Sequence, residues 1–377
     1  MAIIRRYFDY NASAPLSQSA QAALLASFNI YGNPSSVHQE GRAAKALLQK
    51  ARRTLATHLA VDSQNIIFTS GASEAAATLL TPYYKMGRAE IYFSKLYLSA
   101  GEHPAIATGG RFSSINICTI KLKADGCLCF DHLEERLKTH DNKEGLPLVA
   151  VQAANSETGV IQPLIEVAAL VKQYGGVLIV DAAQYFGKLP LNISQFGGDF
   201  FILSGHKIGA PKGIGALVAL GNSLMPTPLI AGGGQENGFR GGTQTAPLAA
   251  AFAAAISDNE AYRSMTHIET VRNYLEEGLK ACVPHITIYG QEAPRLGNTS
   301  YFSIPQLKAE TAQIGFDLAG FATSAGSACS SGKVTKSSIL TAMGVQEHSG
   351  ALRVSLGGEV SFTDIDAFLQ TLKKMLK

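Results

Sequence analysis

Short apolar runs recur along the first two thirds of the chain, and helical segments separate them. The runs cover residues 65–69, 148–152, 177–180, 200–203 and 215–220. Runs of this length without regular polar alternation are typical of strands that are buried on both faces of a parallel sheet. Because they alternate with helical patterns such as the amphipathic segment 40–59, the sequence predicts an α/β chain with a mostly parallel sheet.

The pattern changes after Pro247. We predict an alanine-rich helix over 248–263 and a second helix over 264–280, followed by short strands at 286–289 and 300–304 and a last helix over 364–375. A chain of 377 residues is long enough for two domains. We therefore expect a large domain over 13–250 and a smaller α+β domain over 251–377.

Composition excludes several classes of protein. The formal net charge of +3 is too small to indicate a nucleic-acid or acidic-membrane partner. No apolar run reaches the roughly 18 to 20 residues that a membrane-spanning helix needs. The first residues lack the pattern of a secretory signal, so we expect a cytoplasmic protein. The five cysteines are odd in number and irregularly spaced, which argues against a disulfide framework and a metal site.

Two polar residues end adjacent apolar runs. Lys207 follows the run 200–203 within Ser204-Gly205-His206-Lys207, and Asp181 directly follows the run 177–180. Ligands of α/β sheets bind at the carboxyl ends of the strands, where a partly buried amine can attack a carbonyl group. A carboxylate there can pair with a pyridinium N–H. The alternatives are a solvated loop lysine and an aspartate that only caps the next turn.

A third signal is the small-residue turn around Ala72 and Ser73, which joins a predicted strand to a helix. Backbone N–H groups at such a helix start favour a phosphate, although the same pattern is ordinary capping. The turn is neither a Walker loop nor a dinucleotide fingerprint, because Gly-Lys-Ser/Thr and the G-x-G-x-x-G spacing are absent. This argues against a nicotinamide dehydrogenase.

Three further residues carry chemistry that the sequence leaves open. His103 lies in a loop after a predicted strand, where it could stack on a flat ring or move a proton. Cys329 lies in a run of small polar residues, which is typical of an exposed, reactive thiol. Arg353 lies in an apolar stretch and needs a carboxylate partner, either a substrate or an internal acidic residue.

In this order the motifs resemble the cysteine desulfurases of the NifS/IscS-like kind, which belong to the class V aminotransferases with the fold-type I, pyridoxal-phosphate-dependent transferase fold. The stretches that carry the resemblance are 7–11, 32–36, 68–74, 102–103, 155–159, 180–184, 204–207, 232–236, 240–243, 327–331 and 353–357. They extend over nearly the whole chain. The resemblance also implies that residues 1–12 pack with the C-terminal domain.

The resemblance implies roles around a pyridoxal 5'-phosphate cofactor. Lys207 would bind the cofactor covalently, His103 would stack on its ring, and Asp181 would pair with the ring nitrogen. Gln184 would bond the ring hydroxyl oxygen, with Asn155 beside it. The phosphate would be held by Ala72, Ser73, Ser204 and His206, and by Thr243 of a neighbouring subunit in a homodimer. Arg353 and Asn33 would hold the carboxylate of L-cysteine.

The implied reaction removes sulfur from L-cysteine, gives L-alanine and leaves a persulfide on Cys329. The sulfur would then pass to an acceptor protein, such as a scaffold for iron–sulfur cluster assembly. Two features depart from the family. Ala75-Ala76-Ala77 replaces a usual asparagine after Glu74, and the chain ends soon after Gly357, where family members typically continue with a tail that docks the scaffold. We therefore also expect that the acceptor could be a specialised one.

Other functions stay open at this point. A selenocysteine lyase or a class V aminotransferase would share the fold, and an aminotransferase would not need Cys329. A non-catalytic partner in sulfur transfer would keep the fold, although the intact Lys207 and Cys329 argue against it.

Overall fold

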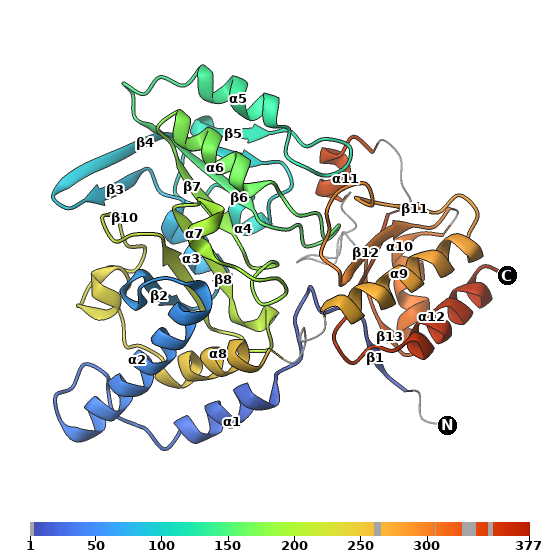
Figure 1. Cartoon of the computed structure of the whole chain (residues 1–377), viewed down its shortest axis with the longest axis horizontal. Coiled ribbons are helices and arrows are strands. Elements are labelled where there is room, and N and C mark those ends of the chain that lie inside the picture. Colours follow the sequence, from blue (N-terminus) through green and yellow to red (C-terminus); the bar gives the residue numbers. More distant parts are fainter. Residues whose placement is uncertain (1–3, 260–264, 306, 326–336, 346–349) are drawn as a thin grey trace.

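The computed structural model describes residues 4–259, 265–305, 307–325, 337–345 and 350–377. Two lobes lie side by side, and the N-terminal strand β1 lies in the lobe that the C-terminal elements form (Figure 1). The first lobe is built on a nine-stranded sheet and the second on a four-stranded sheet. The α/β fold class with a mostly parallel large sheet, which the sequence predicts, is therefore confirmed.

The large sheet has the strand order β10-β3-β4-β6-β7-β8-β9-β2, with β5 paired to β4. Its strands are β2 (Ile66–Thr69), β3 (Tyr83–Met86), β4 (Ala89–Ser99), β5 (Ile117–Ile120), β6 (Leu146–Gln152), β7 (Val177–Asp181), β8 (Phe200–Ser204), β9 (Gly215–Ala219) and β10 (Leu224–Pro226). The central strands β4, β6, β7 and β8 are parallel. Strand β9 runs against both β8 and β2, so β2 has the same direction as the parallel strands.

Helices cover both faces of this sheet. They are α1 (Gln18–Ser27), α2 (Gln39–Leu59), α3 (Ala72–Leu79), α4 (Pro104–Ala107), α5 (Phe130–Lys138), α6 (Leu164–Gln173), α7 (Ile193–Phe196) and α8 (Ala246–Asp258). Alternate residues of one strand enter different cores: Val149 belongs to the core that includes residues of α2, α5, α6 and α8, whereas Leu148 belongs to the core that includes residues of α3 and α4. Burial on both faces explains why these strands are continuously apolar in the sequence.

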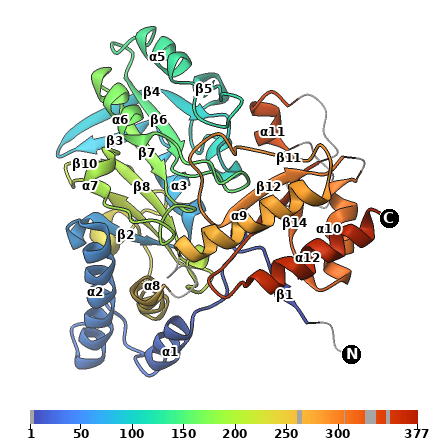
Figure 2. The same ribbon diagram turned by 45° about the vertical axis from the view of Figure 1, so that its right-hand side comes forward.

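The second lobe has its own core. Its sheet has the order β11-β12-β15-β14, from Thr287–Ile288, Thr299–Ser303, Leu352–Ser355 and Ser324–Ala325. Helices α9 (Met265–Cys282) and α12 (Phe362–Met375) lie side by side on it (Figure 2), and α10 (Ala309–Leu318) completes its core. Helix α11 (Ser338–Ala342) instead places Ile339 and Leu340 in the core of the first lobe. Strand β1 (Arg6–Tyr7) pairs with β13 (Phe321–Ala322), and Phe8 joins this core.

The position of helix α8 decides where the domain boundary, expected near residue 250, lies. Helix α8 begins at Ala246, with Pro247 in its first turn, and ends at Asp258, where Asn259 adopts a left-handed conformation (φ 34°). Its buried side chains up to Ile256 belong to the core of the first lobe, and it packs on α1 and α2. The predicted helix over 248–263 therefore ends too late, and we propose that the boundary follows Asp258. The packing of Phe8 and Tyr10 in the second core supports placing the N-terminal segment with that lobe.

The parallel strands direct their carboxyl ends toward one edge of the large sheet. Turns after β2, β4, β6, β7 and β8 therefore meet there, where the second lobe faces them (Figure 1). Within the described ranges no helix is both long and apolar enough to cross a bilayer.

Candidate active site

A cavity of about 760 Å³ lies at this edge of the large sheet. Both lobes line it. The predicted site residues on its wall are Ala72, Ser73, His103, Asp181, Gln184, Ser204, His206, Lys207 and Arg353. Eight of these nine residues lie in or directly after strands of the large sheet that end on the same side, and Arg353 comes from β15 of the second lobe.

Lys207 lies in the single helical turn Gly205–Lys207, directly after β8. Its Nζ donates hydrogen bonds to the backbone oxygens of Asn11 at 2.6 Å and Ala12 at 3.0 Å. A side chain at Gly205 would meet Ile214, so glycine lets this turn pack closely against the residue before β9. The turn delivers the amine to the cavity wall, where a carbonyl compound could reach it.

Asp181 is the last residue of β7, and its Oδ1 accepts the N–H of Ala183 at 3.0 Å. It therefore caps the following turn and lines the cavity at once, so the two interpretations of this residue are compatible. Burial raises the pKa of Asp181, while the hydrogen bond from Ala183 and the positive charge of Lys207 act in the opposite direction. A half-buried carboxyl group on a cavity wall suits a positively charged N–H partner.

His103 caps the short helix α4, and its Nδ1 accepts the N–H of Ala105 at 3.2 Å. Burial lowers the pKa of His103, which favours the neutral imidazole. Because Nδ1 accepts a hydrogen bond, the proton of the neutral ring is on Nε2. His103 can therefore donate from Nε2, and its flat ring lines the same cavity as Asp181.

The start of α3 forms the end of the cavity that suits an anion. Ser70, Gly71, Ala72 and Ser73 line it, and the free N–H groups of a helix start favour negative charge. A side chain at Gly215 would overlap the backbone of Gly71, so glycine lets β9 approach this turn closely.

His206 and Ser204 line the cavity from the end of β8. The Nδ1 of His206 is 3.3 Å from the hydroxyl of Ser13. Burial lowers the pKa of His206 to about 4, and the charges of Lys207 and Lys212 act in the same direction. His206 is therefore neutral near pH 7 and offers a hydrogen bond rather than a charge to an anion.

Gln184 forms a buried group of polar side chains with Asn11 and Lys188, of which the sequence pointed only to Gln184. Its Nε2 donates to the backbone oxygen of Asn11 at 2.9 Å, and its Oε1 accepts from Lys188 Nζ at 2.7 Å. Lys188 also donates to the side-chain oxygen of Asn11 at 2.5 Å. Burial lowers the pKa of Lys188 well below its ordinary value. The only sequence signal for Lys188 was its position four residues after Gln184.

Glu102 is a second residue to which sequence reasoning gave no role. It is buried, and its Oε1 accepts the backbone N–H of Gln152 at 2.8 Å. Burial raises its pKa well above the ordinary value, and the nearby charge of Asp181 acts in the same direction. The shift favours the neutral form of the Glu102 carboxyl group, which lies directly before His103 in the chain.

Arg353 enters the cavity from β15 in the second lobe. Its Nη2 donates to Asp9 Oδ1 at 2.7 Å and its Nη1 to the backbone oxygen of Ser156 at 3.0 Å. The internal acidic partner considered for this arginine thus exists. Since the guanidinium has five N–H donors, it retains capacity for a carboxylate in the cavity.

Among the described residues, three predicted site residues are not on the wall of this cavity. Asn155 is buried behind it and donates to Gly101 O at 3.2 Å and Gln152 Oε1 at 3.4 Å. Asn33 and Thr243 are exposed and do not line it. Cys329 lies outside the residues that the structure describes.

The neighbours of Asn33 and Thr243 meet elsewhere. Pro34, Ser35 and Gln244 line a separate cavity of about 560 Å³, beside α2 and the loop 232–244. The two residues that the resemblance assigns to substrate and cofactor are therefore close together on the surface of the lobe, although neither reaches the cavity of its own chain.

The residues of the first cavity fit pyridoxal phosphate. The half-buried carboxyl group of Asp181 suits the protonated ring nitrogen, an amine suits the aldehyde, and a helix start with two serines suits the phosphate. These three groups lie at the ends of β7, β8 and β2, at one edge of one sheet.

Comparisons with known proteins agree with this chemistry. The family described as aminotransferase class-V matches residues 6–368. The IscS-like cysteine desulfurase of Mycobacterium tuberculosis is 32% identical over 97% of this chain and 95% of its own length. The cysteine desulfurase IscS of Rickettsia typhi is 31% identical over 96% of this chain and 88% of its own length.

Solved structures are similar in fold. A NifS-like protein from Rickettsia africae superimposes with a TM-score of 0.87 at 31% identity, over 100% of this chain and 99% of its own. The structure of SspA in complex with cysteine has a TM-score of 0.75 at 26% identity, over 93% of this chain and 98% of its own. The chain therefore belongs to the aminotransferase class-V family of pyridoxal-phosphate-dependent enzymes, with the fold-type I architecture.

Proposed function

We propose that this enzyme removes sulfur from L-cysteine and carries it as a persulfide on Cys329. The observation that carries the proposal is that Lys207, Asp181 and Arg353 line one cavity, at the carboxyl ends of the parallel strands and against the second lobe. Its IscS-like relatives and the similar structure of SspA in complex with cysteine support L-cysteine as the substrate.

The residues of the cavity divide the work. Pyridoxal phosphate, when bound, supplies an electron sink for the carbon next to the amino group of the substrate. Asp181 would hold the ring nitrogen in its protonated form, and His103 would stack on the ring. The phosphate would be held by Ala72, Ser73, Ser204 and His206. Gln184 would bond the ring hydroxyl oxygen, and Asn155 would hold the cavity wall through its bond to Gln152. Lys207 would take the proton from the substrate carbon.

Cys329 would perform the sulfur step. Its thiolate attacks the sulfur of the substrate, the S–S bond of a persulfide forms as the C–S bond breaks, and the carbon that is left takes up a proton to become L-alanine. Strand β14 ends at Ala325, and Ser324 lines the cavity. Ser324, only a few residues before Cys329 in the sequence, therefore lies on the cavity wall.

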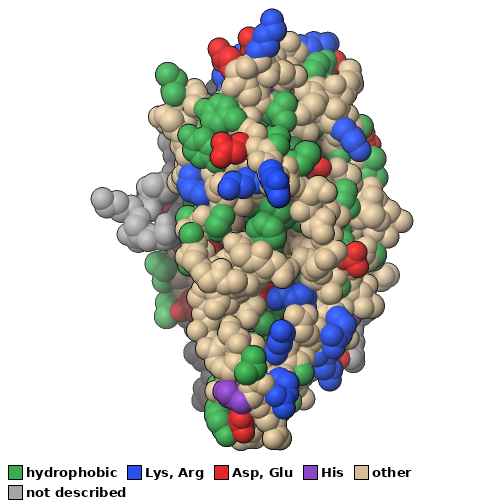
Figure 3. Space-filling model, turned by 90° about the vertical axis from the view of Figure 1, so that its left-hand side faces the viewer, with side chains coloured by type: hydrophobic (Ala, Val, Ile, Leu, Met, Phe, Trp, Pro, Cys, Tyr) green, Lys and Arg blue, Asp and Glu red, His purple; other side chains and the backbone are tan. Residues whose placement is uncertain are grey.

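A homodimer would complete the site. The loop 232–244, which carries Thr243, follows strand β10 in the chain, and β10 pairs with β3. The hairpin of β3 and β4 exposes Tyr83, Met86 and Tyr92. Figure 3 shows hydrophobic side chains gathered in the upper half of the face at the left of Figure 1, with lysine and arginine side chains among them and below them. An exposed apolar patch next to polar groups is typical of a protein interface. A second copy there would receive Thr243 at its cofactor phosphate and Asn33 at its substrate.

The persulfide sulfur must pass from Cys329 to an acceptor. We propose a cytoplasmic acceptor protein, such as a scaffold for iron–sulfur cluster assembly.

The experiment that tests the function compares two cysteine variants. The purified enzyme with pyridoxal phosphate and L-cysteine should form L-alanine and, with a reducing thiol, release sulfide. Cys329→Ala should abolish both products, whereas Cys282→Ala, which changes a half-buried thiol at the end of α9, should form them at the wild-type rate. Turnover that survives Cys329→Ala would contradict the proposal, and formation of a keto acid would indicate transamination.

A further inference from the structure

The loop 232–244 contains two successive residues in an unusual backbone conformation. Glu236 has φ 47° and ψ 41°, and Asn237 has φ 57° and ψ 25°. Residues other than glycine rarely adopt this left-handed region, and each such residue costs free energy that the surrounding contacts must offset. The strain indicates that something holds the loop in one position.

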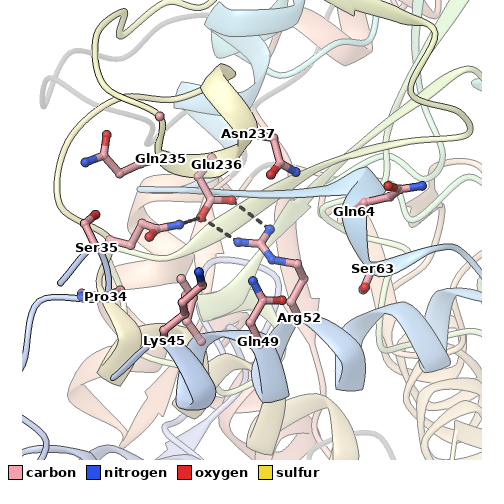
Figure 4. Close-up of a pocket in the computed structure, with 13 residues that line it drawn as sticks. Pro34, Ser35, Lys45, Gln49, Arg52, Ser63, Gln64, Gln235, Glu236 and Asn237 are labelled. Atoms are coloured by element: carbon pink, nitrogen blue, oxygen red, sulfur yellow. Dashed lines mark hydrogen bonds and ion pairs between the residues drawn. The ribbon is translucent and has the colours of Figure 1, made fainter. Parts of the chain in front are cut away.

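A buried ion pair holds it. Arg52 of α2 donates from Nη2 to Glu236 Oε1 at 2.7 Å and from Nη1 to Glu236 Oε2 at 2.9 Å, as Figure 4 shows. The two side chains are 6% and 1% exposed. The guanidinium also lies over the ring of Phe68, 4.9 Å from its centre. An ion pair with two parallel hydrogen bonds fixes the direction as well as the distance of the Glu236 side chain from α2.

The carboxylate of Glu236 connects three segments. Its Oε2 also accepts the backbone N–H of Phe68 in β2 at 2.9 Å, and its Oε1 accepts from the side-chain amide of Gln244. Gln244 is the residue after Thr243. Glu236 therefore closes the loop on itself and ties the position next to Thr243 to β2 and α2.

A second contact fastens the middle of the same loop. Arg240 Nε donates to Glu74 Oε1 at 3.0 Å, and Glu74 Oε2 accepts the N–H of Ser70 at 2.8 Å. Ser70 and Glu74 belong to the turn that starts α3, on the wall of the active-site cavity. The loop is thus fixed both to α2 and to the turn that would bind the cofactor phosphate of its own chain.

We propose that Glu236 and Arg52 are positioning residues that hold Thr243 ready for the cofactor phosphate in a second copy of this chain. The inference rests on the proposed homodimer and on the role proposed there for Thr243. The ion pair itself touches neither cofactor nor substrate: it acts by fixing the backbone on both sides of an exposed hydroxyl group.

The test is a titration of the cofactor-free dimer with pyridoxal phosphate and, separately, with pyridoxal, which lacks the phosphate. Absorbance of the lysine-bound cofactor reports binding. Glu236→Gly should weaken the binding of pyridoxal phosphate about tenfold or more, as expected for a lost hydrogen bond to a charged group, and should leave the binding of pyridoxal unchanged. A merely structural role would weaken both.

The matched control is Asn237→Gly. Both substitutions place glycine at a left-handed position and relieve the same backbone strain, but only the first removes the carboxylate. Asn237→Gly should bind pyridoxal phosphate as the wild type does. If Glu236→Gly does not fold, Arg52→Lys keeps the positive charge but loses the second hydrogen bond, and it should show the same selective loss.

A double variant separates this inference from the proposed function. If Glu236 acts through Thr243, the pair Glu236→Gly with Thr243→Ala should bind pyridoxal phosphate no more weakly than Thr243→Ala alone. Additive losses, equal losses for pyridoxal, or wild-type affinity of Glu236→Gly would each overturn the inference. All these affinities are measured without L-cysteine. A protein that does not remove sulfur from L-cysteine would therefore still give a clear result in these binding experiments.

Discussion

The amine of Lys207 donates a 2.6 Å hydrogen bond to the backbone oxygen of Asn11, so the N-terminal segment holds the end of β8. The same oxygen accepts from Gln184 at 2.9 Å, and Asn298 of the second lobe donates to the Asn11 side chain at 3.1 Å. One residue therefore connects the proposed cofactor lysine with both lobes. Lys207 must leave this oxygen to bond the cofactor covalently.

Lys207→Ala should abolish the covalent attachment and lower turnover on the order of 10²–10⁴-fold, because it removes the amine that moves the substrate proton. Borohydride reduction followed by peptide mass analysis checks the attachment. Lys212→Ala is the control, since Lys212 is an exposed lysine on the same cavity wall. The reduced cofactor should remain on the Lys207 peptide in that variant, and its appearance on another lysine would contradict the assignment.

Asp181→Asn should keep the cofactor but lower kcat on the order of a hundredfold, because an amide cannot stabilise a protonated ring nitrogen as a carboxylate does. The measurement is L-alanine formation at saturating L-cysteine, with cofactor content from absorbance. Asp199→Asn is a matched control. Burial also raises the pKa of Asp199, and its Oδ2 accepts the N–H of Leu178, but it is not on the cavity wall. Similar losses in both variants would indicate a general effect of buried charge.

Arg353→Lys should raise KM for L-cysteine about tenfold or more and change kcat little, because a two-bond contact with the substrate carboxylate becomes a single one. Steady-state kinetics give both constants. Arg272→Lys alters a buried arginine of α9 that donates to Thr299 O outside the cavity, and its KM should stay at the wild-type value. An unchanged KM in Arg353→Lys would mean that Asp9 and Ser156 are the true partners of this arginine.

The pKa of His206 predicts a pH dependence of stability. Burial lowers this pKa from 6.5 to about 4, so between these values the unfolded chain binds a proton that the folded chain does not. The free energy of unfolding must therefore fall as the pH decreases through this window. His206→Gln should show a smaller fall than the wild type. Denaturant unfolding of the cofactor-free protein at several pH values between 4 and 6.5 measures the difference, and identical slopes would contradict it.

The sequence predicts the parts of this molecule that depend on local pattern. The continuous apolar runs identify β6, β7 and β8, and the polar residues that end them identify Asp181 and Lys207. Because carboxyl ends of parallel strands share one edge, their meeting in a cavity could be predicted as well.

Contacts between segments that are distant in the chain leave no pattern in the sequence. Arg52 and Glu236 form a buried pair across 184 positions of the sequence. Each looks like an ordinary surface residue in its own segment, and only the packing of the loop 232–244 on α2 brings them together. Lys188 and Glu102 were missed for the same reason, since their shifted pKa values arise from burial by neighbours that the sequence does not place.

The most direct test of the account is the covalent state of Cys329 after one turnover. The enzyme is incubated with pyridoxal phosphate and an equimolar amount of L-cysteine, alkylated and digested, and its cysteine peptides are analysed by mass spectrometry. The account predicts one added sulfur atom on the Cys329 peptide, together with L-alanine, and none on the peptides of Cys118, Cys127, Cys129 or Cys282. Formation of L-alanine while the Cys329 peptide gains no sulfur would contradict it.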